Sequence, residues 1–250
     1  MDKVLVIGDS CLDEYIYCTA NRFCPDAPVP ILKPESFVST LGMAGNVVDN
    51  LQALEIGVTL ISNANKIKKT RYVDSKTNHM FFRIDEGEDD VFPISQKSLD
   101  NIKWDDYNAV VISDYCKGFI DEDTIKYISQ QHPITFLDTK KQIGNWVEDI
   151  MFIKINDVEY RYSEKFIDKN HKDKLIITRG SNGAEYEGNI YPVKKVDVKD
   201  TSGAGDTFLA GLVGNYLENY NIVEAIKFAN KCATQVVQKK GTAKINKNEI

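Results

Sequence analysis

Short apolar runs rich in β-branched residues recur along the chain, and they constrain the fold more than any other feature. Each run is continuous rather than alternating, which is typical of a strand buried on both faces. The runs lie at 4–7, 58–61, 109–112, 134–137, 151–153 and 175–178. Amphipathic helix patterns separate several of them, at 44–54, 121–130, 205–217 and 222–237. Strands that alternate with helices predict an α/β fold with a mostly parallel sheet covered by helices on both faces.

Two segments break this alternation and predict a small β flap beside the main sheet. The stretches 16–33 and 71–84 have the pattern of extended segments with polar interruptions, and Pro25, Pro28 and Pro30 suit edge strands or turns. We therefore expect a single domain over residues 1–250, with a β lid from about 14–36 and 69–86.

Composition favours a soluble globular protein over several other classes of protein. Apolar residues make up 42% and charged residues 27% of the chain, as in soluble globular proteins. The net charge of −6 gives no general attraction to phosphate backbones, so we expect no nucleic-acid partner. The five cysteines form no Cys-x-x-Cys pair, which favours reduced thiols over disulfides or a zinc cluster. We find no signal-peptide pattern and no apolar run of the roughly 20 residues that cross a bilayer, so we expect a cytoplasmic protein without membrane contact.

The stretch Asp200–Phe208 has the residues best suited to chemistry. A β-rich run at 190–198 precedes it and a helix pattern follows, so its glycines and the helix N-terminus would present N–H donors to an anion. Asp206 would then lie where a carboxylate can accept a proton from a hydroxyl. Two alternatives remain open: a tight turn with a capping Asp206, and a dinucleotide fingerprint, incomplete because Phe208 takes the third glycine position.

Asp200–Phe208 resembles the C-terminal signature of the ribokinase-like (PfkB) carbohydrate kinases. The resemblance implies that Asp206 is the catalytic base and that Gly203, Ala204 and Gly205 supply an anion hole. It places Asp200 and Thr201 near the phosphates or a monovalent-cation site. It also implies ATP and Mg²⁺, with K⁺ left open, and a ribokinase-like fold.

The resemblance extends to the N-terminal part of the chain. Residues 8–13 resemble the first-strand motif whose last aspartate holds substrate hydroxyls, which implies that Asp13 binds the sugar. Residues 42–46 resemble the Gly-Gly-x-x-Asn segment that opens a helix beneath the sugar. Gly42 and Asn46 match this segment, whereas Met43 replaces its second glycine.

A further group of residues is assigned by the resemblance to the nucleotide side. Asn156 and Glu159 match the family's Asn-x-x-Glu, which implies that they position a metal ion and phosphates. The same spacing also suits a helix N-cap with its capping-box partner. Four more residues are implied to lie near the nucleotide: Thr178, Gly180, Gly183 and Asn230.

Several motifs resemble one subgroup, the heptose-7-phosphate kinases. They lie at 22–30, 69–71, 83–85, 113–118 and 138–140. The resemblance implies phosphorylation of O1 of D-glycero-D-manno-heptose 7-phosphate for nucleotide-heptose and surface-polysaccharide synthesis. Lys69, Arg71, Arg83 and Lys117 would grip the phosphate of that sugar, although each taken alone can also be a solvated surface charge.

The chain departs in length from the family that it resembles. The stretch 62–68 is shorter than the family's equivalent, so we expect a helix–strand unit to be missing there. We also expect no nucleotidylyltransferase domain, and a homodimer that pairs through the flap. The alternatives are a kinase of the same fold that acts on another sugar, sugar phosphate or nucleoside, and a binding protein of this fold without turnover.

Overall fold

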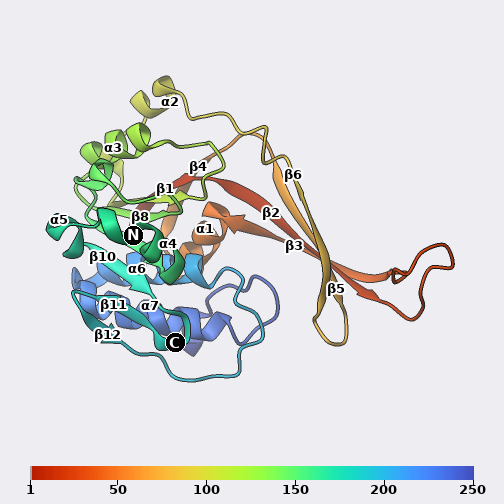
Figure 1. Ribbon diagram of the computed structural model, residues 1–250. Coiled ribbons are helices and arrows are strands. Elements are labelled where there is room, and N and C mark those ends of the chain that lie inside the picture. Colours follow the sequence, from red (N-terminus) through yellow and green to blue (C-terminus); the bar gives the residue numbers. More distant parts are fainter. Residues whose placement is uncertain (1) are drawn as a thin grey trace.

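The computed structural model describes residues 2–250, which form a main sheet covered by helices and a second sheet that projects from it (Figure 1). The main sheet has the order β12-β11-β10-β9-β8-β7-β1-β4. Its strands are β1 (Lys3–Gly8), β4 (Gly57–Ser62), β7 (Ala109–Asp114), β8 (Thr135–Thr139), β9 (Phe152–Asn156), β10 (Leu175–Thr178), β11 (Ala184–Tyr186) and β12 (Asn189–Tyr191). Neighbouring strands from β4 to β10 pair in parallel. Strand β11 pairs antiparallel with both β10 and β12. This confirms the predicted α/β fold class.

Helices cover both faces of the main sheet, because its strands are apolar on both faces. The α-helices are α1 (Ala44–Ala53), α2 (Gln96–Asp100), α3 (Glu122–Gln131), α4 (Asp157–Ser163), α5 (Lys169–Lys172), α6 (Ala204–Asn219) and α7 (Ile222–Val236). In β1, Val4 and Val6 pack in the core cluster that contains side chains of α1, α6 and α7. The alternate residues Leu5 and Ile7 pack in a second cluster with side chains of α3. The period-2 alternation of a strand thus supplies both cores.

The second sheet has the order β3-β2-β5-β6 and extends away from the main body (Figure 1). Its strands are β2 (Ser10–Thr19), β3 (Lys33–Met43), β5 (Ile67–Asp74) and β6 (Met80–Glu86). The sheet occupies the region predicted for the lid but reaches further into the body than 14–36 and 69–86. Residues 63–66 connect β4 directly to β5, so no helix intervenes in this part of the structure.

Strand register divides the second sheet into two chemically different faces. On one face Ile16 lies opposite Phe37 and Tyr72, and Tyr72 in turn lies opposite Phe82. We call this the outer face: it carries this group of apolar side chains, together with Glu14 and the Lys68–Glu86 ion pair. On the other face Asp13 lies opposite Lys69, and Tyr15 lies opposite Arg71. The hydroxyl of Tyr15 lies 3.2 Å from the side-chain oxygen of Thr242 in the C-terminal segment, so this inner face is turned toward the main body.

The predicted β-rich run at 190–198 is wrong beyond its first two residues. Strand β12 ends at Tyr191, and residues 192–199 have no regular secondary structure. Pro192 lacks an N–H group and cannot donate to a sheet ladder, which accounts for the end of the strand. Among residues 2–250, no helix combines the length and the apolar character needed to cross a bilayer.

Candidate active site

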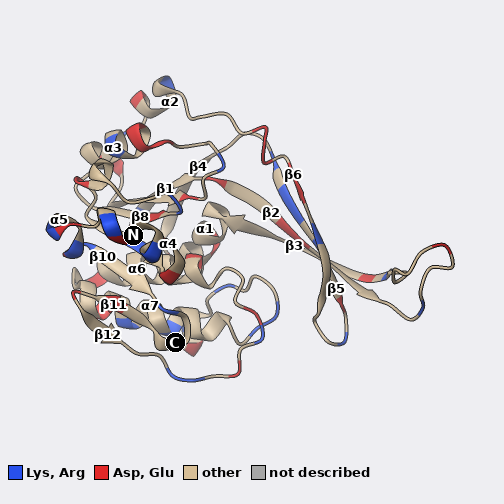
Figure 2. Cartoon of the chain, viewed as in Figure 1, with Lys and Arg blue, Asp and Glu red and all other residues tan. Residues whose placement is uncertain are grey.

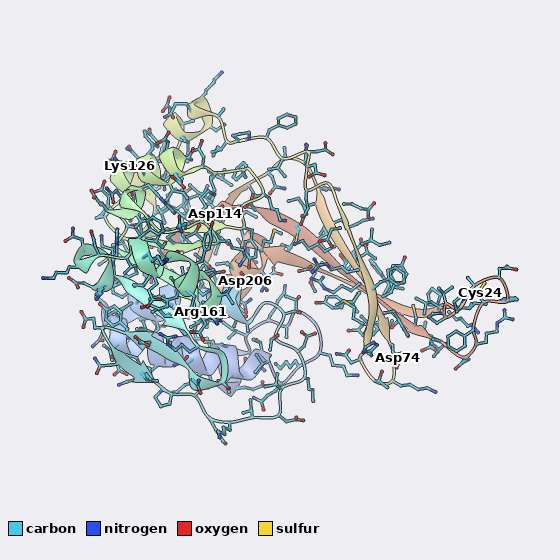
Figure 3. All side chains as sticks on the ribbon, viewed as in Figure 1. Cys24, Asp74, Asp114, Lys126, Arg161 and Asp206 are labelled. Carbon is cyan, nitrogen blue, oxygen red and sulfur yellow. The ribbon has the colours of Figure 1, made fainter. Side chains whose placement is uncertain are left out.

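A glycine turn and the first turn of α6 form the centre of the site. Gly203 precedes the helix with φ 75°, a left-handed conformation in which a glycine is strongly favoured. Asp206 lies in the first turn with only 3% of its surface exposed. Because the N-terminus of a helix carries partial positive charge, this position favours a carboxylate. In Figure 3 the labelled Asp206 lies near the centre of the molecule, toward the second sheet.

Both oxygens of the Asp206 carboxylate accept hydrogen bonds from other elements. The Asn46 side-chain amide in α1 donates to Oδ2 at 3.0 Å, and the Tyr115 hydroxyl after β7 donates to Oδ1 at 2.5 Å. The amide of Asn46 also lies 3.3 Å from the carbonyl oxygen of Gly203, and Asn50 donates to its Oδ1 at 3.0 Å. The carboxylate is therefore held between α1, α6 and the loop after β7.

The environment of Asp206 suits a base that works near neutral pH. Burial raises the pKa of its carboxyl from 3.8 to about 6, although the hydrogen bonds from Tyr115 and Asn46 and the charge of Lys154 act in the opposite direction. Asp138 adds to the rise by charge repulsion. A carboxyl with this pKa is ionised at pH 7 and still basic enough to take a proton.

A cavity of about 770 Å³ opens beside Asp206. Ten of the residues singled out in the sequence line it: Asn156, Thr178, Gly180, Gly183, Thr201, Gly203, Ala204, Gly205, Asp206 and Asn230. Val193, Val196 and Val198 add apolar surface to the lining, as does Ala233 on α7. The cavity thus joins an apolar slot to a glycine turn with N–H donors, as a nucleotide requires.

Asp200 lies outside this lining and supports the turn instead. Its carboxylate accepts the N–H groups of Ser202 at 2.9 Å and Gly241 at 3.0 Å, which ties the turn to the C-terminal segment. The N–H of Ala204 donates to the carbonyl of Thr201 at 3.2 Å, so it is already engaged within the turn. Whether these residues contact phosphates stays a prediction.

Asn156 and Glu159 form a complete capping box at the start of α4. Asn156 Oδ1 accepts the N–H groups of Val158 and Glu159, and Glu159 Oε2 accepts the N–H of Asn156 at 2.7 Å. Lys140 pairs with Glu159 Oε1 at 2.9 Å. Within residues 2–250, no group of three or more His, Cys, Asp or Glu side chains is arranged to hold a metal ion. The side-chain oxygens of Asn156 and Glu159 therefore have partners within the protein, and a role in positioning a metal ion stays a prediction.

A buried ion pair that the sequence motifs do not predict lies in the cavity wall. Lys154 on β9 lies 2.7 Å from Asp138 on β8, and both side chains are 6% exposed. A Cβ atom at Gly205 would lie 3.0 Å from Lys154 Nζ, so the amine lies against the glycine turn. The signal was present in the sequence, because a lysine at the carboxyl end of a parallel strand lies where ligands bind.

The predicted sugar residues lie on the inner face of the second sheet and on α1. Asp13 on β2 forms an ion pair with Arg71 on β5 at 2.5 Å. A Cβ atom at Gly42 would lie 2.2 Å from Asp13 Oδ2, so only glycine lets this carboxylate pack against β3. The structure thus brings Asp13, Arg71 and Gly42 together, and Asn46 links α1 to Asp206.

The predicted phosphate-gripping cations already have carboxylate partners. Glu88 lies 2.5 Å from Lys117 and 3.2 Å from Lys69, and Arg83 pairs with Asp85 at 2.7 Å. Figure 2 shows charges of both signs along β5 and β6. A bound phosphate would have to share or displace these carboxylates.

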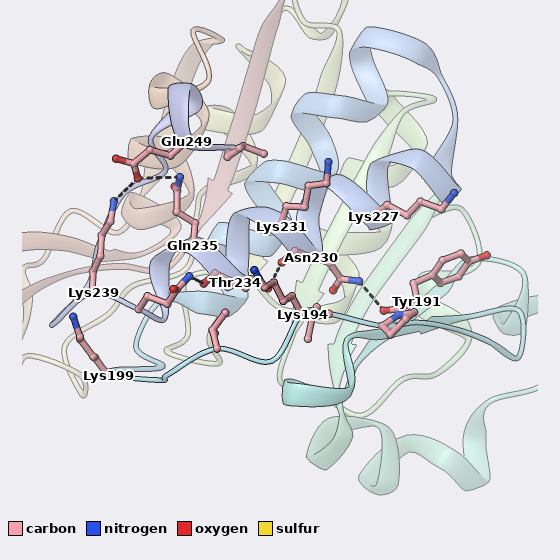
Figure 4. Close-up of a pocket in the computed structure, with 15 residues that line it drawn as sticks. Tyr191, Lys194, Lys199, Lys227, Asn230, Lys231, Thr234, Gln235, Lys239 and Glu249 are labelled. Atoms are coloured by element: carbon pink, nitrogen blue, oxygen red, sulfur yellow. Dashed lines mark hydrogen bonds and ion pairs between the residues drawn. The ribbon is translucent and has the colours of Figure 1, made fainter.

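A second cavity, of about 1090 Å³, follows the other side of α7 (Figure 4). Five lysines line it: Lys194, Lys199, Lys227, Lys231 and Lys239. It shares Asn230, Thr234 and part of the 193–196 segment with the first cavity, but its lining does not include Asp206. The chemistry of the glycine turn therefore belongs to the first cavity.

Comparison with known proteins decides the family. The profile of the pfkB family of carbohydrate kinases matches residues 92–249, more than half of the chain. The chain belongs to the pfkB family of carbohydrate kinases. It is therefore a phosphotransferase with an alcohol group as acceptor.

Relatives of known name agree with this assignment. This kinase is 29% identical over 299 residues to the bifunctional protein HldE of Nitratiruptor and 30% identical over 298 residues to that of Campylobacter jejuni. Each alignment covers 99% of the kinase but only 64% of the relative, so the kinase spans under two thirds of these proteins.

Solved structures share the fold of this kinase at low sequence identity. The ribokinase of Thermotoga maritima has a TM-score of 0.71 at 16% identity, covering 98% of this chain and 97% of that one. The Arabidopsis thaliana ribokinase, solved with ribose and ATP, has a TM-score of 0.71 at 16% identity, covering 99% and 97%. At this identity the likeness establishes the fold.

We expect Gly203→Ala to cost more than backbone strain alone. A Cβ atom there would lie 2.5 Å from Asn46 Nδ2, so the substitution should push Asn46 away from Asp206. Gly188→Ala is the matched control, because Gly188 has φ 74° in open space. Left-handed strain should cost each variant about 1–2 kcal/mol of unfolding free energy. Only Gly203→Ala should also lose most kinase activity; equal activity in the two variants would contradict the assigned contact.

Proposed function

We propose that this kinase transfers the γ-phosphoryl group of ATP to O1 of D-glycero-D-manno-heptose 7-phosphate, forming the 1,7-bisphosphate for nucleotide-heptose synthesis. The observation that carries the kinase chemistry is the buried Asp206 at the N-terminus of α6, held by Asn46 and Tyr115 beside the first cavity. The motifs at 22–30, 69–71 and 113–118 and the likeness to the HldE proteins support the heptose acceptor.

The proposed reaction needs one proton acceptor and one anion site. The acceptor oxygen forms a bond to the γ-phosphorus, the bond between that phosphorus and the β,γ-bridging oxygen breaks, and its electron pair stays on ADP. The hydroxyl proton passes to Asp206, which must be ionised beforehand. Residues of the first turn of α6 and Lys154 line the cavity where negative charge would develop.

The two substrates would occupy different parts of the molecule. ATP would occupy the first cavity, with its base in the apolar slot near Asn230 and its phosphates at the glycine turn. Asn156 and Glu159 would hold Mg²⁺ through water, and the ion would neutralise phosphate charge. Asp13 and Asn46 would hold sugar hydroxyls.

Asp206→Asn should lower turnover at least about 100-fold, because the amide cannot accept the proton. Nucleotide affinity should stay within a few-fold, because the turn and cavity keep their shape. The measurement is ADP release together with ATP titration by calorimetry. Asp197→Asn, which alters an exposed carboxylate just before the same turn, is the control and should be neutral. Near-normal turnover of Asp206→Asn would remove this residue from the mechanism.

Lys117→Met should raise KM about 10- to 100-fold for a phosphorylated heptose, as expected for the loss of a charged hydrogen bond. The KM for the same heptose without phosphate should hardly change. Lys68→Met is the control. Lys68 lies on the opposite face of β5 from Lys69, and its side chain pairs with Glu86. Steady-state kinetics with both acceptors decide the matter.

An equal effect of Lys117→Met on both acceptors would favour the alternative of an unphosphorylated sugar or nucleoside. The pairing of Lys69 and Lys117 with Glu88 is the observation that keeps this alternative open, because the cluster is neutralised in part without any ligand.

We also propose a homodimer formed through the outer face of the second sheet. Phe37, Phe82 and Ile84 lie on this face and are 58%, 46% and 43% exposed. Exposed apolar rows of this kind mark protein interfaces, and a second copy offers the same row.

Phe37→Glu should shift the molecular mass in light scattering from dimer to monomer at micromolar concentration, because it places a charge in the apolar row. Phe92→Glu is the control: Phe92 is 75% exposed but lies outside the sheet. A monomeric parent protein, or a Phe37→Glu variant that stays dimeric, would contradict this interface.

A further inference from the structure

Tyr115 is held in place by a buried carboxylate that the catalytic reaction does not use. Asp9 follows β1 and is fully buried, and its carboxylate accepts the N–H groups of Tyr115 at 2.8 Å, Lys117 at 3.2 Å and Phe119 at 3.4 Å. Cys116 between them adopts φ 55°. Asp9 therefore fixes the loop after β7, and the parallel pairing of β1 with β7 fixes Asp9.

The ring of Tyr115 is also confined. It packs against the apolar cluster of Cys11, Met43 and Ile67. The amine of Lys140 lies over the ring, 4.7 Å from its centroid. With its backbone and ring both held, the hydroxyl makes one hydrogen bond among residues 2–250, to the Oδ1 atom of Asp206.

The Tyr115 hydroxyl is a permanent donor in this environment. Burial and the nearby charge of Asp206 raise the pKa of Tyr115 well above its usual value of 10, so it stays protonated at working pH. A neutral donor bonded to a carboxylate stabilises the ionised form, which opposes the effect of burial on Asp206.

We propose that Tyr115 is a positioning residue for proton transfer: its hydroxyl holds Asp206 ionised and aims the carboxylate at the acceptor hydroxyl. This inference rests on the proposed role of Asp206 as the base. Asn46 holds the other oxygen, and each carboxylate oxygen retains a further lone pair for the incoming hydroxyl. Tyr115 gives up no proton in this scheme.

Four other titratable groups surround Asp206: Asp138 on β8, Lys154 on β9, Lys140 after β8 and Cys11 on β2. Tyr115→Phe removes one oxygen atom and leaves these groups and the ring packing in place, so a change in the pH profile reports the lost hydrogen bond.

The experiment is the pH dependence of kcat/KM for Tyr115→Phe, Tyr127→Phe and the parent kinase. The parent should lose activity as pH falls through about 6, the pKa of Asp206. Tyr115→Phe should move this acid limb up by about one unit, the equivalent of one charge-assisted hydrogen bond. Relative to the parent at the same pH, the activity of the variant should then be about tenfold lower at pH 5 and nearly unchanged at pH 8. Tyr127→Phe, which removes a tyrosine–aspartate hydrogen bond on the surface, should leave the limb unchanged.

An acid limb at the parent position in Tyr115→Phe, with activity lowered equally at every pH, would overturn the positioning role. If Asp206→Asn is inactive while Tyr115→Phe shows no shift, only this inference fails. If Asp206→Asn is active and the parent has no limb near pH 6, the proposed base fails as well. Should Tyr115→Phe not fold, 3-fluorotyrosine at position 115 is the second variant. Its more acidic hydroxyl donates more strongly and should move the limb down instead.

Discussion

The proposed chemistry depends on keeping one carboxylate charged inside the protein. Burial alone drives Asp206 toward its neutral form, and a neutral carboxyl cannot take a proton from a sugar hydroxyl. Four features oppose the effect of burial: the N-terminus of α6, the amide of Asn46, the hydroxyl of Tyr115 and the charge of Lys154. Because they come from four different parts of the chain, the charge state of the site depends on how the whole domain is assembled.

Parallel topology is what brings these elements together. The carboxyl ends of β1, β7, β8 and β9 meet at one edge, where Asp9, Tyr115, Asp138 and Lys154 lie. Met43, just before α1, is strained: it has φ 58° and ψ −132° at the position where the segment that residues 42–46 resemble has its second glycine. Such a conformation costs about 1–3 kcal/mol in a residue with a side chain. The side chain offsets part of this cost by packing with Cys11 and Ile67, next to Tyr115.

Sequence predicted the strands and long helices well because their apolar patterns are long and their period is clear. It predicted the glycine turn because only a few residue types suit a left-handed φ beside a helix N-terminus. It assigned no role to Lys154, because the apolar run ends at 153 whereas β9 continues to Asn156. It also could not show that Lys69 and Lys117 share Glu88, because these partners come from separate strands and loops. Such pairings depend on three-dimensional packing, which local periodicity does not encode.

The short connection at 63–66 determines how the second sheet is aligned with the main sheet. Strands β1 and β4 pair in parallel up to Gly8 and Ser62, and the chain then continues from them into β2 and β5, which again pair in parallel. Asn63 joins the two exits, since its side chain accepts the N–H of Ser10 at 2.7 Å and donates to the Ser10 carbonyl at 3.1 Å. An inserted helix–strand unit would separate β4 from β5. Its absence from this connection lets the main-sheet ladder run on into the second sheet, so the placement of Asp13 and Arg71 follows directly from the register of β1.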